Sequence, residues 1–553
     1  MKALIGNMVP MSDGVRLATD VWLPDGPGRF PAILLRTPYH RQDGAPLSYV
    51  AQGYAVVVQD CRGKYDSEGV FTPLADEARD GQDTIAWIAD QKWCNGRIGM
   101  LGASYLGFVQ IPAASGGHEA LRCMVPQVTS ASFFRHWARY DGCPALSNGL
   151  IWNLTHAVCR TKPTVSHFSW EELYGLATLG DIFARVGYEC GTLRKWFEHD
   201  RYDEYWKGID QFPMHEKIKV PGCHMGGWFD HHLQGQCETY GRIRDLGGTE
   251  AARTGQRLII GPWGHSTFYG IGAQHRRYGD WDFTAAADVP VRTFEERFLN
   301  LYLRDEDDGL SEEPPVRVFL MGANRWIDLA DWPPPDAEDQ TWYLRSEGHG
   351  DTRSGPGRLT RESPGREPPD HYEYDPRNPM PTRGGPVYQG MEARGPLDQR
   401  PILDRSDFVY YRSDPLPKPL ALVGNIELDL WVASSALDTD FIARLCVVEP
   451  SGAVTCFTYG SLRCRYRENW AEPKPLDPNV PTSIHIQMGH SAYVFPQGSR
   501  IALLVTSSSF PRIIPNPNTM APPFSAGPVQ SAQQVIFHDT AHPSCLHLPV
   551  LDG

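Results

Sequence analysis

The chain reads RIGMLGASYLG at residues 97–107, with Ser104 between an apolar run and the start of a helical pattern. This layout is typical of a nucleophile elbow, a sharp strand-to-helix turn that exposes the serine hydroxyl and points the next backbone N–H at a developing oxyanion. The generic elbow has glycine two positions after the serine, whereas here Leu106 stands there and Gly107 follows. Taken alone, the stretch fits an ordinary strand-turn-helix junction capped by Ser104 about equally well.

Short apolar runs alternate with helical patterns on both sides of this serine. Apolar residues have helical spacing at 76–89 and at 291–303. The predicted strands cover residues 15–22, 32–35, 55–58, 98–101, 220–226 and 257–261. Strands that alternate with helices in this way predict a mostly parallel sheet covered on both faces.

Two other zones interrupt and follow this pattern. Residues 129–217 lose the strand signal and accumulate aromatic side chains, which indicates a helical insertion. Residues 348–401 are rich in Pro, Gly and Arg and are expected to form long, partly extended loops. Beyond them, apolar and polar residues alternate with a period of two at 426–432 and 484–487. Many short strands with Gly and Pro turns predict a β-sandwich for this last zone.

Length and composition exclude several classes of protein. A chain of 553 residues is long enough for several domains, and its net charge of −14 argues against nucleic acid or an anionic membrane surface as a partner. The N-terminus lacks the apolar core of a signal peptide, and no stretch approaches the ~20 apolar residues that a membrane-spanning helix needs. Twelve cysteines without Cys-x-x-Cys spacing are expected to be buried or free thiols, which favours a cytoplasmic protein.

Two segments after Ser104 supply the partners that a serine nucleophile needs. Asp230 ends the segment GGWFD at residues 226–230, and His265 lies in GPWGHS at residues 261–266. Each segment follows a predicted strand, so both side chains are expected at the carboxyl edge of the parallel sheet. His265 would take the serine proton and Asp230 would orient the imidazole, in the chain order of α/β-hydrolases. Taken singly, Asp230 also fits a helix N-cap, and His265 a loop histidine bonded to backbone.

A fourth candidate residue is Tyr39, which ends the stretch LRTPY directly after an early predicted strand. The loop at this place in α/β-hydrolases helps to build the oxyanion hole. The Tyr39 hydroxyl, presented by Pro38, could donate to an oxyanion beside the backbone N–H of Tyr105. A tyrosine after proline also fits a packed loop aromatic.

These residues, with others in order along the chain, resemble the cocaine-esterase and X-Pro dipeptidyl-peptidase group of serine hydrolases. The resemblance covers nearly the whole chain. It is carried by RTPY (36–39), DCRG (60–63), SEG (67–69), GASYLG (102–107), GWFD (227–230), GPWGHS (261–266), MGAN (321–324) and DTDF (438–441). Glycine at the third position after the serine matches the pattern of this group.

The resemblance implies an α/β fold with three domains. They are an α/β-hydrolase core over residues 1–131 and 213–332, a helical cap over 132–212, and a C-terminal β jelly roll over 333–553. It also implies an enzyme that cleaves a carboxylic ester or amide bond of a small molecule through an acyl-enzyme on Ser104. Neither a cofactor nor a metal is expected.

The resemblance further implies roles for residues around the serine. Tyr39 and Tyr105 are expected to form the oxyanion hole, and Trp137 and Trp152 to line the acyl pocket, although both tryptophans also fit plain cap core. His232 stands where the cocaine-esterase branch has an aromatic pocket residue, which argues against a preference for benzoyl esters. The amino-acid ester hydrolase branch surrounds its site with acidic residues, and no such cluster adjoins the motifs here.

Several functions remain open at this point. The same acyl-enzyme would serve an X-Pro dipeptidyl-peptidase. It would also serve an acyltransferase, in which an amine or alcohol takes the acyl group instead of water. A non-catalytic binding protein on a hydrolase scaffold is a further alternative, but all three candidate triad residues are present. The expected partner is a small-molecule ester or amide rather than a nucleic acid or membrane, and a homo-oligomer is compatible with the sequence.

Overall fold

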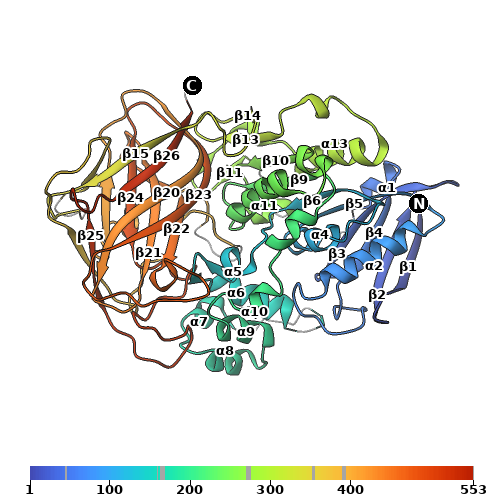
Figure 1. Cartoon of the computed structure of the whole chain (residues 1–553), viewed down its shortest axis with the longest axis horizontal. Coiled ribbons are helices and arrows are strands. Elements are labelled where there is room, and N and C mark those ends of the chain that lie inside the picture. The colour runs from blue at the N-terminus through green and yellow to red at the C-terminus, as the bar shows by residue number, and fades with distance from the viewer. Residues whose placement is uncertain are drawn as a thin grey trace.

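A ten-stranded sheet forms the centre of the N-terminal part of the molecule (Figure 1). The computed structural model describes residues 1–43, 46–158, 160–161, 168–269, 276–350, 355–388 and 394–551. The strands from β4 to β13 in the sheet order run parallel, and antiparallel strands complete both edges, so the predicted mostly parallel sheet is confirmed. In sheet order the strands are β1 (Lys2–Pro10), β2 (Arg16–Leu23), β4 (Ala55–Asp60), β3 (Phe30–Thr37), β5 (Cys94–Ala103), β6 (Leu121–Gln127), β9 (Gly222–Gly227), β10 (Gln256–Gly261), β13 (Val316–Leu320) and β14 (Arg325–Leu329).

Apolar side chains cover both faces of this sheet. Successive residues of a strand point to opposite faces, so Leu34 joins one buried cluster and Leu35 another. Ile85 and Ile111 from α2 and α4 pack into the first cluster, and Phe298 from α13 packs into the second. The helices of this part are α1 (Ser48–Ala51), α2 (Glu77–Ala89), α3 (Tyr105–Phe108), α4 (Gln110–Ala114), α11 (Leu233–Leu246), α12 (Glu250–Thr254) and α13 (Val291–Arg304).

Short helices between β6 and β9 lie between the sheet and the C-terminal part of the chain (Figure 1). Their own apolar cluster includes Leu150, Ile182 and Leu193, and Ile514 from the C-terminal part packs into it. The elements are α5 (Phe133–His136), β7 (Arg139–Tyr140), β8 (Cys143–Pro144), α6 (Ser147–Trp152), the π-helical turn η1 (Asn153–Ala157), α7 (Trp170–Tyr174), α8 (Leu179–Val186), α9 (Gly191–Glu198), α10 (Glu204–Lys207) and the 3₁₀ turn η2 (Phe212–Lys217).

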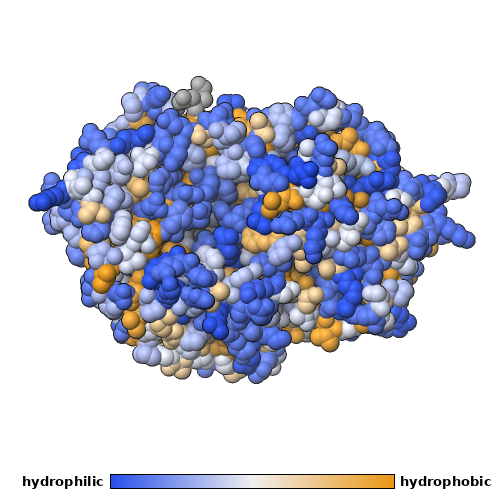
Figure 2. Space-filling model, in the orientation of Figure 1, coloured by the Kyte–Doolittle hydropathy of each residue, from blue (hydrophilic) through white to orange (hydrophobic). Residues whose placement is uncertain are grey.

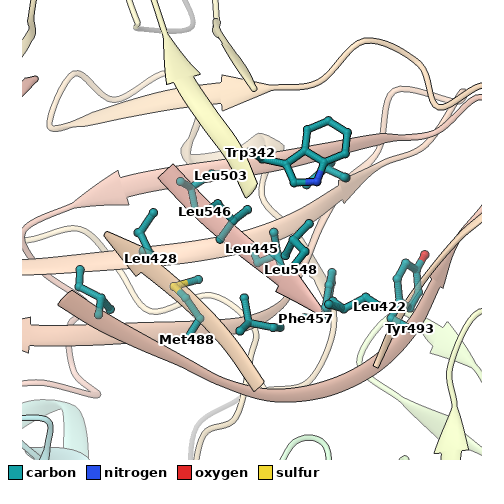
Figure 3. Packing of buried hydrophobic residues seen from close by; sticks show 14 of the residues in the cluster. Trp342, Leu422, Leu428, Leu445, Phe457, Met488, Tyr493, Leu503, Leu546 and Leu548 are labelled. Atoms are coloured by element: carbon teal, nitrogen blue, oxygen red, sulfur yellow. The ribbon is translucent and has the colours of Figure 1, made fainter. Parts of the chain in front are cut away.

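The C-terminal part is a β domain in which the described residues form twelve strands. Leu428, Leu445, Leu503 and Leu546 meet in its core, and Met488 joins them (Figure 3). The strands follow the path β17 (Asp370–Tyr374), β25 (Ala532–Phe537), β20 (Leu420–Ser434), β26 (Cys545–Leu551), β15 (Glu338–Arg345), β16 (Gly357–Thr360), β19 (Phe408–Arg412), β24 (Arg500–Thr506), β21 (Asp440–Val448), β22 (Val454–Arg463) and β18 (Leu397–Asp398), while β23 (Thr482–Phe495) pairs with β20.

The Pro-, Gly- and Arg-rich residues 348–401 differ in part from the expected loops. Three short strands, β16, β17 and β18, belong to this segment, and β17 and β18 end the path of paired strands. The strands themselves contain no proline, and Pro369 and Pro396 stand directly before β17 and β18, where a missing N–H interrupts no strand pairing. Composition therefore indicates the loops of this segment but hides its edge strands.

Shorter elements connect these parts. They are the hairpin strands β11 (Arg277–Tyr278) and β12 (Trp281–Asp282) and the 3₁₀ turns η3 (His265–Tyr269), η4 (Ala285–Ala287), η5 (Leu310–Glu312), η6 (Arg400–Ile402) and η7 (Cys464–Tyr466). The face shown in Figure 2 is mainly hydrophilic, with apolar residues in small separate groups. None of the described helices is long and apolar enough to cross a membrane. The eleven described cysteines are buried and form no disulfide, as their spacing predicts.

Candidate active site

Ser104 lies at the turn between β5, which ends at Ala103, and α3, which begins at Tyr105. Its backbone has φ +57° and ψ −123°, outside the regions that non-glycine residues usually adopt. Strain of this kind costs on the order of 1–3 kcal/mol and concentrates at functional sites. The turn therefore has the strained geometry of a nucleophile elbow rather than that of an ordinary helix cap.

Two glycines make room for this turn. A Cβ on Gly102 would lie 2.4 Å from the Cβ of Leu106, and a Cβ on Gly107 would lie 2.9 Å from the carbonyl oxygen of Gln127 at the end of β6. The backbone N–H of Ser104 donates to that same carbonyl at 2.9 Å. The close approach of helix and strand explains why glycine stands three positions after the serine.

Asp230 and His265 lie in the loops that follow the neighbouring parallel strands β9 and β10. The Nδ1 atom of His265 is 2.6 Å from Oδ2 of Asp230, and both side chains are buried. Backbone hydrogen bonds join the loops, since the N–H of Phe229 donates to the carbonyl of Trp263 at 3.0 Å. Gly227 permits this contact, because a Cβ there would lie 2.3 Å from the same carbonyl oxygen. Adjacent strand ends thus bring together two residues that are 35 positions apart.

The surroundings of Asp230 favour its ionised form. Burial acts to raise the pKa of this carboxyl, but the contact with His265 outweighs it and the pKa lies below its ordinary value. The backbone N–H of His232 donates to Oδ1 at 2.7 Å and supports the same charge state. Asp230 is therefore a fixed carboxylate that accepts a hydrogen bond from the imidazole of His265.

Tyr39 follows β3 and turns its hydroxyl toward Ser104. The Ser104 side chain and the backbone N–H of Tyr105 are among the groups that affect the pKa of this hydroxyl, so both lie near it. The indole N–H of Trp152 donates to it at 3.1 Å. Burial raises the pKa of Tyr39 to about 12, so its hydroxyl keeps its proton near neutral pH and can donate it in a hydrogen bond.

The side chain of Tyr105 points away from this site. Its hydroxyl donates to Glu77 Oε1 at 2.8 Å and accepts from the backbone N–H of Leu74 at 3.0 Å. The backbone N–H of Tyr105 is therefore the group that this residue offers near Ser104.

Trp137, Trp152 and His232 lie together next to Tyr39, whose hydroxyl Trp152 contacts. The rings of Trp137 and Trp152 meet edge to face with centroids 4.7 Å apart, and the ring centroid of His232 lies 5.5 Å from that of Trp137. Phe108 packs against both Trp137 and His232. Each of the three predicted pocket residues is about 1% exposed, and burial lowers the pKa of His232 to about 3, so its imidazole is neutral.

A cavity of about 560 Å³ adjoins the elbow on another side. Tyr39, Gly102 and Ala103 border it, as do Glu295 and Gln127, whose carbonyl accepts from the backbone N–H of Ser104. Its volume is in the range of small-molecule sites. The three predicted pocket residues Trp137, Trp152 and His232 are not among the described residues that line it.

Tyr388 closes part of this cavity and comes from the C-terminal β domain. Its ring centroid is 5.6 Å from that of His265 and 5.1 Å from that of His231. Sequence reasoning does not find this residue, because no motif surrounds it in the connection between β17 and β18. The folded chain alone brings it to the site.

His231, His232 and His265 form a cluster with ring nitrogens within 4.8 Å of one another, a spacing that a metal ion could use. The ring of His231 is tilted by 41° against that of His232 and meets that of Tyr388 edge to face, and burial lowers the pKa of His231 well below the ordinary histidine value. A smaller cavity of about 70 Å³ lies beside Asp230 and His231 and extends to Arg512 of the β domain. The surroundings of the pair Asp230–His265 thus include both domains.

Comparisons with known proteins identify the family of this chain. Residues 13–267 match the X-Pro dipeptidyl-peptidase (S15) family, and residues 308–547 match the C-terminal non-catalytic domain of X-Pro dipeptidyl-peptidases. The chain is 34% identical to cocaine esterase from Rhodococcus sp. (strain MB1 Bresler), in an alignment that covers 98% of each protein.

Two solved structures share the whole architecture. An aminopeptidase from the marine sediment archaeon Thaumarchaeota archaeon has a TM-score of 0.87 at 26% identity, and an alpha-amino acid ester hydrolase has a TM-score of 0.83 at 27% identity. Each comparison covers 100% of this chain and 96% of the other. The chain therefore belongs to the family of the X-Pro dipeptidyl-peptidases and cocaine esterase, and it is a serine hydrolase with an α/β-hydrolase domain and a separate C-terminal β domain.

Proposed function

We propose that Ser104, His265 and Asp230 form a catalytic triad that cleaves a carboxylic ester or amide bond of a small molecule. The 2.6 Å contact between His265 and Asp230, made at the same sheet edge as the strained Ser104, carries this proposal. Family membership supports hydrolysis of ester or amide bonds. The domain limits near residues 131, 212 and 332 stay a prediction.

The proposed reaction has two halves. His265 Nε2 takes the proton of Ser104 as Oγ bonds to the carbonyl carbon, and the carbonyl oxygen becomes an oxyanion. His265 then gives this proton to the leaving oxygen or nitrogen, whose bond to carbon breaks and leaves an acyl-enzyme. A water molecule gives a proton to His265 and attacks the acyl carbon, after which the proton returns to Oγ and the acid is released.

Tyr39 and the backbone N–H of Tyr105 are the proposed donors to the oxyanion. Their contacts around Ser104 support this role, because donors must face the position where negative charge develops. Trp152 donates to the oxygen of Tyr39, and a hydroxyl that accepts one hydrogen bond becomes a better donor in the next. Trp152 thus acts on the reaction through Tyr39, and Trp137 and His232 stay predicted to border the acyl group.

A second candidate is hydrolysis at an aminoacyl group, the substrate class suggested by the names of the two structural relatives. The motifs of this chain show no acidic cluster, but the fold brings Asp43, Arg292 and Glu295 to the wall of the cavity. The side chains of Tyr49 and Gln127 donate to the two oxygens of Glu295 and hold them in place. Burial raises the pKa of Glu295, so a substrate ammonium would stabilise the carboxylate.

Ester hydrolysis by Ser104→Ala tests the triad. With p-nitrophenyl esters we expect a burst of p-nitrophenol equal to the enzyme concentration in the unmodified protein, and kcat up to about 10⁶-fold lower in the variant. A fluorophosphonate should label the peptide that contains Ser104. Ser115→Ala is the matched control, because Ser115 only caps the end of α4 through a bond to the carbonyl of Pro112. Full activity of Ser104→Ala, or a label on another serine, would contradict the triad.

Glu295→Gln separates the two substrate classes. If the natural acyl group carries an ammonium, KM for an aminoacyl p-nitroanilide should be about 10–100-fold higher in the variant. This factor corresponds to the free energy of a hydrogen bond to a charged group. Hydrolysis of p-nitrophenyl butyrate, which has no ammonium, should stay the same. Equal losses on both substrates would show that Glu295 supports the site only structurally and would contradict the aminoacyl candidate.

A further inference from the structure

Side chains that commonly bind transition metals form a row across one face of the C-terminal β domain. Asp339 comes from β15, Cys545 and His547 from β26, Asp429 from β20 and His485 from β23. The register places Asp429 directly opposite Cys545 on one neighbouring strand and opposite His485 on the other. Three strand pairings thus bring together residues that are up to 208 positions apart in the chain.

This row lies on the face opposite the core. Leu428 and Leu546 point into the packed interior (Figure 3). Neighbouring residues of a strand point the other way, so Asp429, Cys545 and His547 share the outer face. The side chain of Asp429 is 44% exposed and that of His547 is 24% exposed. Cys545 itself is buried, so an ion from solvent reaches it from the side of Asp429 and His547.

Three ligand atoms in the row converge. The Nε2 atom of His547 is 3.4 Å from Sγ of Cys545 and 3.2 Å from Oδ2 of Asp429, and one ligand atom from each of the three residues lies within 4.8 Å of the others. Tetrahedral zinc with bonds of about 2.0–2.3 Å holds its ligand atoms roughly 3.3–3.6 Å apart. Both short distances are close to that spacing.

Two further residues hold these ligands in orientation. Oδ2 of Asp339 is 3.1 Å from Nδ1 of His547, the ring nitrogen that faces away from Cys545. Metal-bound histidines usually donate their second ring N–H to a carboxylate in this way. His485 contacts Oδ1 of Asp429 at 2.8 Å and leaves Oδ2 directed at His547. The carboxylate–histidine arrangement is the independent feature that distinguishes this cluster from a chance group of polar residues.

We propose that Cys545 Sγ, His547 Nε2 and Asp429 Oδ2 bind a divalent transition-metal ion of the zinc class, with Asp339 and His485 as supporting residues. Thiolate, imidazole and carboxylate are ligands that Zn²⁺ accepts together, and the exposed side leaves a fourth position for water. Binding releases to solvent the protons carried by the thiol and by Nε2. The ion joins β26, the last strand, to β20 and is expected to stabilise the β domain.

An ion-pair network is the competing explanation. Hydrogen bonds, of which the one to Asp429 has the largest effect, raise the pKa of His547 to about 11. Without a metal, the imidazole of His547 is therefore a cation beside carboxylates. Cys545 adds to that raised pKa, but the two carboxylates can pair with the cation without it, whereas the proposed metal site cannot form without the thiolate. The role of Cys545 therefore decides between the two explanations.

Titration of the reduced full-length protein with Co²⁺ tests the site, because a Co²⁺–thiolate bond absorbs in the near ultraviolet. We expect this absorption to saturate at one Co²⁺ per chain and to disappear on addition of Zn²⁺. Cys545→Ser should abolish it, and Asp339→Asn should weaken binding by about 10–100-fold. His542→Gln is the matched control, because His542 contacts Asp539 at 3.2 Å in the same domain without a thiol partner. Absence of the absorption, or its persistence in Cys545→Ser, would overturn the proposal.

Thermal unfolding gives a second readout that does not depend on colour. Zn²⁺ should raise the Tm of the unmodified protein and of His542→Gln, because an ion that binds the folded state stabilises it. Mg²⁺, which prefers oxygen ligands, should not. Ser104-dependent ester hydrolysis verifies that Cys545→Ser is folded before titration. If Zn²⁺ raises the Tm of Cys545→Ser equally, the ion binds elsewhere and the proposed site is wrong.

Discussion

The α/β domain and the C-terminal β domain each bring a tyrosine to the cavity beside Ser104, but by different means. Tyr39 stands two residues after β3, and its hydroxyl is held by the indole N–H of Trp152. Tyr388 lies in the connection between β17 and β18 and packs against His265 and His231. A strand end positions the first residue, whereas only packing between domains positions the second. Their functions should differ accordingly.

Between the two tyrosines, the larger effect is expected for Tyr39→Phe. Loss of one oxyanion donor should lower kcat about 10²–10³-fold with little change in KM, because the hydrogen bond from Tyr39 to the substrate oxygen strengthens in the transition state. Trp152→Phe keeps an aromatic ring but removes the N–H, and should lower kcat less than Tyr39→Phe does. Steady-state hydrolysis of p-nitrophenyl acetate measures both. A Tyr39→Phe enzyme with normal kcat would exclude this hydroxyl as an oxyanion donor.

A smaller effect is expected for the same change in the other domain. Tyr388→Phe should change kcat by less than about threefold, because we assign its ring, rather than its hydroxyl, to the cavity wall. Tyr388→Ala should raise KM about tenfold through the loss of apolar contact area. If Tyr388→Phe lowers kcat as much as Tyr39→Phe, both domains supply donors and the contrast between them fails.

The smallest effect concerns the junction between the helical segment and the β domain. Asp141 lies between β7 and β8, and its carbonyl accepts from the backbone N–H of Arg463 on β22. Burial raises the pKa of Asp141 from 3.8 to about 6. The folded state therefore favours the protonated carboxyl, and this contribution to stability is complete below about pH 4 and is lost as the pH rises through 6.

Asp141→Asn imitates the protonated form at every pH. The variant should be more stable than the unmodified protein at pH 7 by on the order of 2 kcal/mol, and the difference should vanish at pH 4. Tm measured from pH 4 to pH 7 checks this. Asp336→Asn, on an exposed turn, should show no such trend. A Tm difference that does not change with pH would contradict the raised pKa.

Local patterns predict much of the catalytic domain. β5, β9 and β10 lie close to their predicted positions, and so do α2 and α13, because their apolar spacing is regular. β6 is not indicated, since Arg122 and Pro126 interrupt its apolar run LRCMVPQ. Its place in the parallel sheet is decided by the strands on either side.

The arrangement of the predicted site residues was likewise predictable only in part from the sequence. The contact between Asp230 and His265 was predictable from motif order because both follow adjacent parallel strands. Burial of Trp137 and Trp152 agrees with the cap-core alternative that the sequence left open for them, whereas the burial of His232 leaves no signal in the sequence. Burial depends on which side chains fill the space above the sheet.

The sequence by itself determined the elbow, the order of the candidate triad and the family, because a tight turn and a catalytic loop require particular residues next to one another. The tertiary structure alone decided that Tyr388 and Glu295 reach the same cavity, and that Asp429 meets Cys545. Such contacts depend on strand register and domain packing. Neither leaves a local pattern, because the residues that meet are far apart in the chain.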